Sequence, residues 1–156
     1  MNKIYICFLL LLIIISCNEN KKDYYTFPNQ KWNTDSIIVF DVENHDTINL
    51  SNIQLSIRHT TSYSYQNLIL FLHHYNKGIK IYTDTLNIDL SMDNGSWIGN
   101  GKSDIRELIF TNDKSRIFKS GIHTIKLELA MRENNNIEIS ELKHISDISV
   151  NIFNNE

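Results

Sequence analysis

The stretch from Gly95 to Ser103, "GSWIGNGKS", ends in Gly-Lys-Ser, as a phosphate-binding loop does. The phosphate-loop motif needs another glycine five positions before Gly101, and the chain has Ser96 there. Trp97 and Ile98 also occupy the part of the loop where backbone amides would have to curl around a phosphate. The spacing therefore argues against a nucleotide site.

The same stretch is more typical of a β-hairpin. Asn94-Gly95 follows an alternating segment and favours a type I′ turn, because both residues tolerate positive φ. "SWIG" then begins the return strand, in which Gly99 and Gly101 predict a bulge or a close approach of another backbone segment.

A calcium site is a weaker alternative in the same region. Asp89, Ser91 and Asp93 have the odd-numbered spacing that begins an EF-hand loop. The loop glycine should then be sixth, whereas Gly95 is seventh, and the twelfth position holds Asn100 in place of glutamate. An EF-hand is excluded, and an irregular calcium site in a loop stays open.

Six histidines are present, but their spacing matches no zinc motif. His73 and His74 are adjacent, so in a strand their side chains point to opposite faces and cannot chelate one ion together. We expect surface or strand-edge positions for these residues, and no metal site. The histidines are His45, His59, His73, His74, His123 and His144.

No motif for nucleophilic catalysis stands out, since G-x-S-x-G is missing. Asp and Glu occur throughout the chain, so a carboxylate pair for glycoside hydrolysis stays an open alternative without a nominated pair. Clustered aromatic residues suggest either a sugar-stacking or protein-binding surface or, as we favour, a segment packed over the edge of the fold. They are Tyr24, Tyr25, Phe27, Trp32, Tyr63 and Tyr65.

The elements that must position these residues are predicted to be strands. Apolar and polar residues alternate with a period of two over residues 53–57, 86–92, 125–131 and 148–152. Two continuous apolar runs, 37–42 and 67–72, are typical of the central strands of a sandwich.

Turn-forming residues separate these segments at 44–46, 77–78, 94–95, 120–121 and 134–136. The pattern predicts an all-β chain folded as an antiparallel β-sandwich of jelly-roll type, with a barrel as the alternative. Residues 104–109, "DIRELI", fit a short helix or a strand about equally well.

The N-terminus predicts a lipoprotein signal peptide over residues 1–16. Lys3 precedes an apolar run from Tyr5 to Ile15, which is too short to span a membrane. The run closes with "IISC", which resembles a bacterial lipobox in which Cys17 receives the lipid. An uncleaved N-terminal anchor is the alternative.

If Cys17 is lipidated and Cys7 leaves with the signal peptide, no thiol remains for a disulfide or a Cys-based metal site. Residues 17–23 then form the lipidated cysteine and a polar tether, followed by one β-sandwich domain over residues 24–156. The formal net charge of −3 argues against a protein that binds the nucleic-acid backbone.

Several stretches, taken in order, resemble the gliding-motility lipoprotein family GldH of Bacteroidota. They are "YTFPNQKW" with "DSIIVFDV", "LSIRHTTSYSYQNLILFL", "DTLNIDLSMDNGSWIGNGKSDI" and "FKSGIHTIKLELAMRE". The third contains the most distinctive block, G-x-W-x-G-x-G. His123 departs from the family pattern, which is expected to have an aromatic residue such as Tyr at this position.

The resemblance implies a lipoprotein of the outer membrane, on its periplasmic face or at the cell surface, that is needed for gliding and tied to type IX secretion. It implies a non-catalytic role in docking to other gliding and secretion proteins, with no small-molecule substrate and no cofactor besides the covalent lipid, such as palmitate, on Cys17. A surface glycan-binding lipoprotein is the alternative. The residues predicted to serve the fold or docking are Trp32, Arg58, Tyr63, Tyr65, Trp97 and Arg132.

Overall fold

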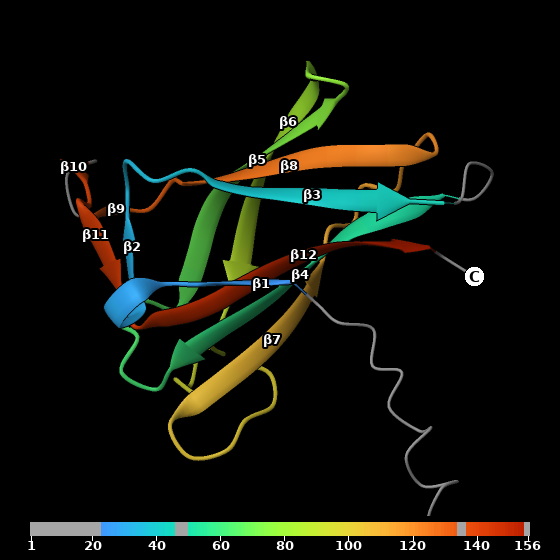
Figure 1. Cartoon of the computed structure of the whole chain (residues 1–156). Coiled ribbons are helices and arrows are strands. Elements are labelled where there is room, and N and C mark those ends of the chain that lie inside the picture. The colour runs from blue at the N-terminus through green and yellow to red at the C-terminus, as the bar shows by residue number, and fades with distance from the viewer. Residues whose placement is uncertain (1–22, 46–49, 134–136, 155–156) are drawn as a thin grey trace, which may run out of the picture.

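A computed structural model of the chain describes residues 23–45, 50–133 and 137–154 (Figure 1). The described residues form strands, turns and one short 3-10 segment, η2 (Pro28–Gln30), and no helix among them is long and apolar enough to cross a membrane. The strands are β1 (Tyr24–Thr26), β2 (Lys31–Asn33), β3 (Ile38–Asn44), β4 (Ser51–Thr60), β5 (Asn67–Asn76), β6 (Ile79–Asp89), β7 (Ile105–Thr111), β8 (Gly121–Leu129), β9 (Arg132–Glu133), β10 (Ile137–Glu138), β11 (Glu141–Lys143) and β12 (Ile145–Asn154).

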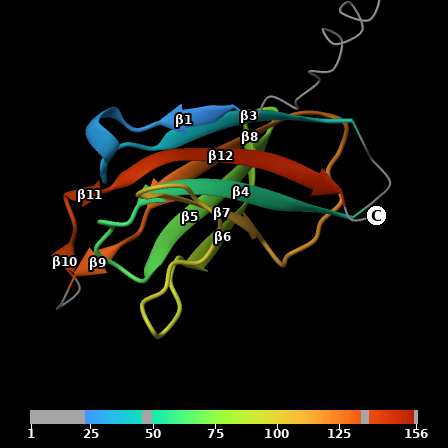
Figure 2. The same cartoon turned by 90° about the horizontal axis from the view of Figure 1, so that it is seen from below.

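Two four-stranded antiparallel sheets form the body of the molecule, in the orders β1-β12-β4-β7 and β3-β8-β5-β6. Two short pairs, β2 with β11 and β9 with β10, extend it at one end (Figures 1 and 2). If the eight main strands are numbered along the chain, the sheet orders become 1-8-3-6 and 2-7-4-5. That is the order of a jelly roll, so the predicted sandwich and its jelly-roll type are confirmed.

The core lies between the two sheets and is built by the alternation that the sequence shows. Leu68, Leu70 and Leu72 of β5 and Ile125 and Leu127 of the neighbouring β8 are fully buried, with Leu72 directly opposite Leu127. Each buried aliphatic side chain of this size contributes about 1.5–3 kcal/mol relative to an exposed one. The alternating segments are therefore strands whose inner faces supply one continuous core.

The two continuous apolar runs have different positions in the sheet. The run 67–72 belongs to β5, which lies between β8 and β6 as a central strand should. The run 37–42 belongs to β3, so its predicted central position is wrong, because β3 is an edge strand and pairs with β8 alone. Ile38 and Phe40 point into the core, while Val39 between them is 52% exposed.

Residues 104–109 do not form a helix. Residues 105–111 are β7, paired with β4 from Ile105 opposite Thr60 to Thr111 opposite Gln54. The local spacing suits either state, and the continuous pairing with β4 decides for a strand. Leu108 and Phe110 consequently pack against the core.

The hairpin predicted at Asn94-Gly95 exists, but its turn is not type I′. Asn94 does not have positive φ, whereas Gly95 has φ of +82°. The Gly95 amide donates to the Met92 carbonyl and the Ser96 carbonyl accepts from the Met92 amide, which makes a three-residue loop closed by a glycine in the left-handed region. A single positive-φ position is enough for such a loop.

The prediction for the next two glycines is confirmed. A Cβ on Gly99 would overlap the carbonyl oxygen of Glu107, and one on Gly101 would overlap that of Ile105. Asn100 and Glu107 exchange two backbone hydrogen bonds at this point. Residues 99–101 therefore lie against β7, with no room for side chains at either glycine.

Candidate functional site

Trp32 is fully buried on β2. Its ring stacks on Phe27 with 4.8 Å between the centroids, and its Nε1 donates a hydrogen bond to the Ser36 carbonyl oxygen. Leu142 of β11 lies opposite Trp32 in the two-stranded pair. Trp32 therefore fastens the β2–β11 pair to the core, and its ring presents no surface to a partner.

Arg58 lies on the outer face of the β1-β12-β4-β7 sheet in a cluster of its own. Its guanidinium carbon is 4.1 Å from the centroid of the Tyr24 ring, and its Nη2 is 3.6 Å from Glu107 Oε2. The Tyr24 hydroxyl donates to Glu107 Oε1 at 2.7 Å, and the Ser56 hydroxyl donates to the same oxygen at 2.5 Å. These contacts connect β1, β4 and β7 across one face of the sheet.

Trp97 is half-buried and packs inward. Its ring lies 4.8 Å from His59 and 6.4 Å from Tyr63, centroid to centroid, and Tyr63 lies 5.8 Å from Tyr65. Tyr63 is buried and donates its hydroxyl hydrogen to the Asn67 carbonyl, and burial raises its pKa well above the ordinary value. The group around Tyr63 is thus a packed cluster under the 95–103 loop.

Arg132 is exposed on β9 and pairs with Glu138 on β10 at 3.1 Å. Its neighbour Glu133 accepts a hydrogen bond from the Tyr65 hydroxyl. The structure therefore brings Tyr63, Tyr65 and Trp97 together, with the β9 hairpin beside them, and leaves Trp32 and Arg58 apart. The aromatic residues do not gather into an exposed platform, since Phe27, Trp32 and Tyr63 are buried.

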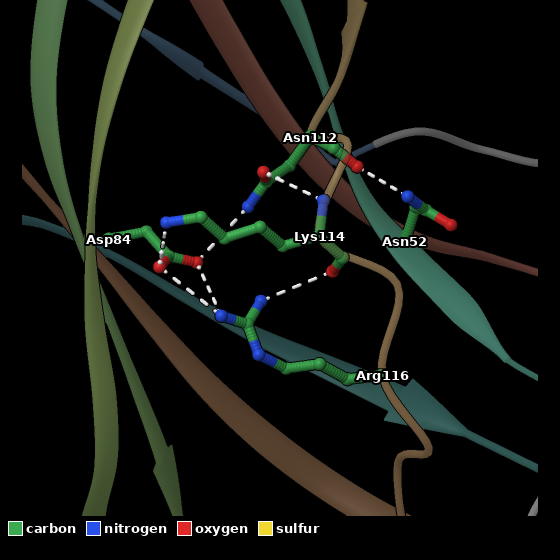
Figure 3. Close-up of polar contacts among 5 residues, drawn as sticks. All are labelled: Asn52, Asp84, Asn112, Lys114 and Arg116. Atoms are coloured by element: carbon green, nitrogen blue, oxygen red, sulfur yellow. Dashed lines mark hydrogen bonds and ion pairs between the residues drawn. The ribbon is translucent and has the colours of Figure 1, made fainter.

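A buried acidic residue that the sequence analysis did not single out lies on the inward face of β6. Asp84 of β6 is 4% exposed. Lys114 Nζ donates to its Oδ1 at 2.8 Å, Arg116 Nη2 lies 3.0 Å from its Oδ2, and Asn112 Nδ2 donates to Oδ2 at 3.2 Å (Figure 3). Asn52 of β4 donates in turn to the Asn112 carbonyl (Figure 3). The segment between β7 and β8 is thereby tied to both sheets.

The charges around Asp84 determine its protonation. Burial by itself raises the pKa of this carboxyl, but the hydrogen bonds from Lys114 and Asn112 and the charges of Arg116 and Lys114 together outweigh burial, and the pKa lies below the ordinary 3.8. The alternation along β6 in the sequence already indicates that Asp84 faces inward. Asp84 has the parity of the inward-facing Leu86 and Ile88, and an acidic residue on an apolar face needs cationic partners.

Three histidines are also buried, contrary to the expectation of surface positions: His59, His74 and His123. His74 Nε2 and His123 Nδ1 are 2.8 Å apart, and His123 Nε2 is 2.7 Å from the Lys119 carbonyl oxygen. A carbonyl only accepts, so His123 Nε2 carries a hydrogen. The ring nitrogen of the pair that takes part in neither contact is His74 Nδ1. That nitrogen is buried and has no partner among the described residues.

The surroundings of His74 disfavour the charged form of its ring. Burial, then the charges of His123 and Arg116, lower the pKa of His74 to about 4. The adjacent His73 points to the opposite face, as predicted, where it contacts Thr83 and Glu128. Within residues 23–45, 50–133 and 137–154, no three His, Cys, Asp or Glu side chains gather as a metal-binding group.

The two histidines line a groove of about 330 Å³ between the β5–β6 hairpin and the segment before β8. We call it the hairpin groove. Its surface is mainly apolar, and among the described residues that line it two are lysines and none is acidic. It is lined by His74, Asn76, Lys77, Ile79, Ile81, Ile117, Phe118, Lys119 and His123.

Comparison with known proteins gives one consistent result. The sequence model of the family described as GldH lipoprotein matches residues 19–152. The chain is 28% identical over 148 residues to a "Gliding motility lipoprotein GldH homolog" of Christiangramia forsetii, covering 93% of this chain and 91% of the relative. It is 26% identical over 149 residues to "Gliding motility lipoprotein GldH" of Flavobacterium johnsoniae, covering 94% and 93%. No solved structure matches.

Proposed function

Because the chain belongs to the GldH lipoprotein family, we propose that it is an outer-membrane-anchored component or assembly factor of the gliding-motility and type IX secretion machinery. The observation that carries this proposal is the match of the family model over residues 19–152, nearly the whole chain. Two relatives that bear gliding-motility lipoprotein names match over at least 91% of their own length. We therefore propose that this chain also acts in gliding motility.

We place the membrane attachment at Cys17. The predicted signal peptide 1–16, Cys17 and the tether up to residue 22 lie outside the described residues, so the support is the lipobox pattern in the sequence. Two or more acyl chains hold a protein stably on a membrane. Confinement to a surface raises the effective concentration of the domain near partners in the same membrane.

We propose further that the domain acts by docking and not by catalysis. The relatives are named for motility and for their lipid, and neither name describes an enzyme. The most deeply buried carboxylate of the described residues, Asp84, is committed to Lys114, Arg116 and Asn112. That arrangement holds the two sheets together and makes Asp84 a structural residue.

The test is deletion of the gene, with colony spreading and secretion of type IX cargo as readouts. We expect both to be lost and to be restored by the wild-type gene. A gene carrying Cys17→Ala should restore neither, and fractionation should find that variant protein outside the outer membrane. Normal spreading and normal cargo secretion in the deletion strain would refute the proposed function.

A further inference from the structure

The hairpin groove has an unusually apolar rim for a solvent-facing surface. Ile79 is 68% exposed, Ile81 is 55% exposed and Ile117 is 61% exposed, and all three line the groove. Single exposed apolar residues are normal, but a contiguous group around a concave site is typical of an interaction surface. Phe118 lies buried behind them and continues the apolar wall inward.

The backbone is shaped to present this rim. His74 pairs with Tyr82 and Tyr75 pairs with Lys80, so Ile81 is an extra residue in β6. Such a bulge re-aims a side chain. It lets Ile81 line the groove while its neighbour Tyr82 also packs against the core.

The turn that carries one of the groove lysines is also unusual. Lys77 has φ of +49° and Gly78 has φ of +78°, so both residues of the two-residue turn are in the left-handed region. Asn, Asp or Gly suits the first position of such a turn better than Lys, because a longer side chain is strained there. A lysine therefore stands at the rim although the backbone disfavours it.

The electrostatics of the groove favour an anion. Lys77 and Lys119 line it, and no acidic side chain does so among its described lining residues. His74 and His123 also line the groove, both nearly inaccessible, and His74 Nδ1 has no hydrogen-bond partner among the described residues. A ligand that fits must combine an aliphatic group with a carboxylate placed at the rim.

We infer, resting on the proposed docking function, that the hairpin groove binds a segment of a partner protein. An aliphatic side chain of that segment enters between Ile81 and Ile117, and an acidic residue next to it faces Lys77 and Lys119. A protein fits better than a single lipid or metabolite, because much of the apolar surface lies on the exposed rim. Apolar anchors seated in a pocket and surrounded by a polar rim are typical of the centre of a protein interface.

The test is photo-crosslinking in the native host, with the full-length chain as the sole copy. A benzophenone amino acid replaces Ile81 or Ile117. The matched control is Ile109, which is 52% exposed on β7 of the opposite sheet. We expect both groove positions, and not position 109, to give an adduct with one protein. Mass spectrometry should place the adduct in a segment that carries an aliphatic residue beside Asp or Glu.

Charge reversal then tests the recognition itself. Lys77→Glu with Lys119→Glu should reduce the adduct yield roughly tenfold, because attraction becomes repulsion. Lys102→Glu, an exposed lysine on another face, should leave the yield unchanged. Equal amounts of protein and an unchanged melting temperature show that the variants fold.

Four outcomes overturn the inference: no adduct at the groove positions, the same adduct from position 109, an adduct with a lipid, or a crosslinked segment without an acidic residue. None of these outcomes refutes the proposed function, which is tested by colony spreading and cargo secretion in the deletion strain. Conversely, a deletion strain that spreads and secretes normally refutes the proposed function whatever the crosslinks show.

Discussion

Replacement of Asp84 by asparagine tests whether the buried carboxylate holds the segment between β7 and β8 against the sheets. The substitution keeps the size of the side chain and removes its charge. Lys114 and Arg116 then lose their anion, and the introduced amide places an N–H donor among groups that are themselves donors. We expect a fall in the free energy of unfolding without a change of fold.

The size of the effect follows from burial. A hydrogen bond to a charged group contributes about 1.5–3 kcal/mol, and breaking a fully buried ion pair costs about 3–5 kcal/mol. Asp84 is buried, but the Lys114 side chain is 54% exposed and that of Arg116 is 29% exposed, so water screens part of the attraction. We expect a loss of about 2 kcal/mol, which corresponds to a fall in Tm of roughly 6–10 °C.

The pH dependence has a definite sign. The pKa of Asp84 is lowered in the folded protein, so its ion pairs contribute fully above the unfolded pKa. That contribution is lost as the pH falls through the lower, folded pKa. The stability gap between the wild type and Asp84→Asn should therefore be constant from neutral pH down to about pH 4 and shrink below it.

Thermal and urea unfolding of the purified full chain, followed by circular dichroism, measures this gap. The control is Asp41→Asn on β3, an exposed carboxylate that accepts a hydrogen bond from Thr124. It should change the free energy of unfolding by less than about 0.5 kcal/mol. If the two substitutions cost the same, or if the gap is unchanged at pH 3, the structural role assigned to Asp84 is wrong.

Three further predictions concern His74, Trp97 and the glycines at 95 and 99. The pKa of His74 is lowered to about 4 from 6.5, so the stability of the protein should decline as the pH falls from 6.5 to 4. His74→Phe should flatten a plot of Tm against pH in that window. An unchanged slope would contradict the assignment. Trp97→Ala should cost about 2–3 kcal/mol in urea unfolding, below the value for a fully buried Trp because the ring is half-buried, and a loss under about 0.5 kcal/mol would mean that the ring does not pack inward. Gly99→Ala should lower the free energy of unfolding by more than about 2 kcal/mol, because the added Cβ meets the Glu107 carbonyl and the backbone has positive φ. Gly95→Ala, which has positive φ but open space around it, should lower it by about 1 kcal/mol. Equal losses would refute the close approach at Gly99.

The strands were the most predictable part of the molecule, because inward and outward positions alternate along each of them. The alternation over 86–92 and 125–131 marks most of the inner faces of β6 and β8. The same pattern was not sufficient for residues 104–109, where pairing with β4 decided between two locally acceptable states. It also did not reveal that β3 is an edge strand, because the position of a strand in a sheet depends on residues distant in sequence.

For the candidate sites too, the sequence predicts which way a side chain faces but not which distant residue it meets. Parity along β6 marks Asp84 as inward-facing, but its partners come from the segment before β8, about 30 residues away in the chain. Spacing alone shows that His73 and His74 separate, and it does not show that His74 meets His123. Of the six residues nominated from the resemblance, the fold gathers Tyr63, Tyr65 and Trp97.

By itself, the sequence determined the class of the fold, the turns at 77–78 and 94–95, the resemblance to GldH lipoproteins and the two glycines that admit a neighbouring backbone. These properties are local, since they depend on residue type and on spacing over a few positions. The turn predicted at 134–136 and the end of the one at 44–46 lie outside the described residues. Only the tertiary structure decided which strands are edges, which polar residues are buried and where the hairpin groove lies. Those properties come from the jelly-roll order, which brings β5, β6, β8 and the segment before β8 together at one end of the sandwich.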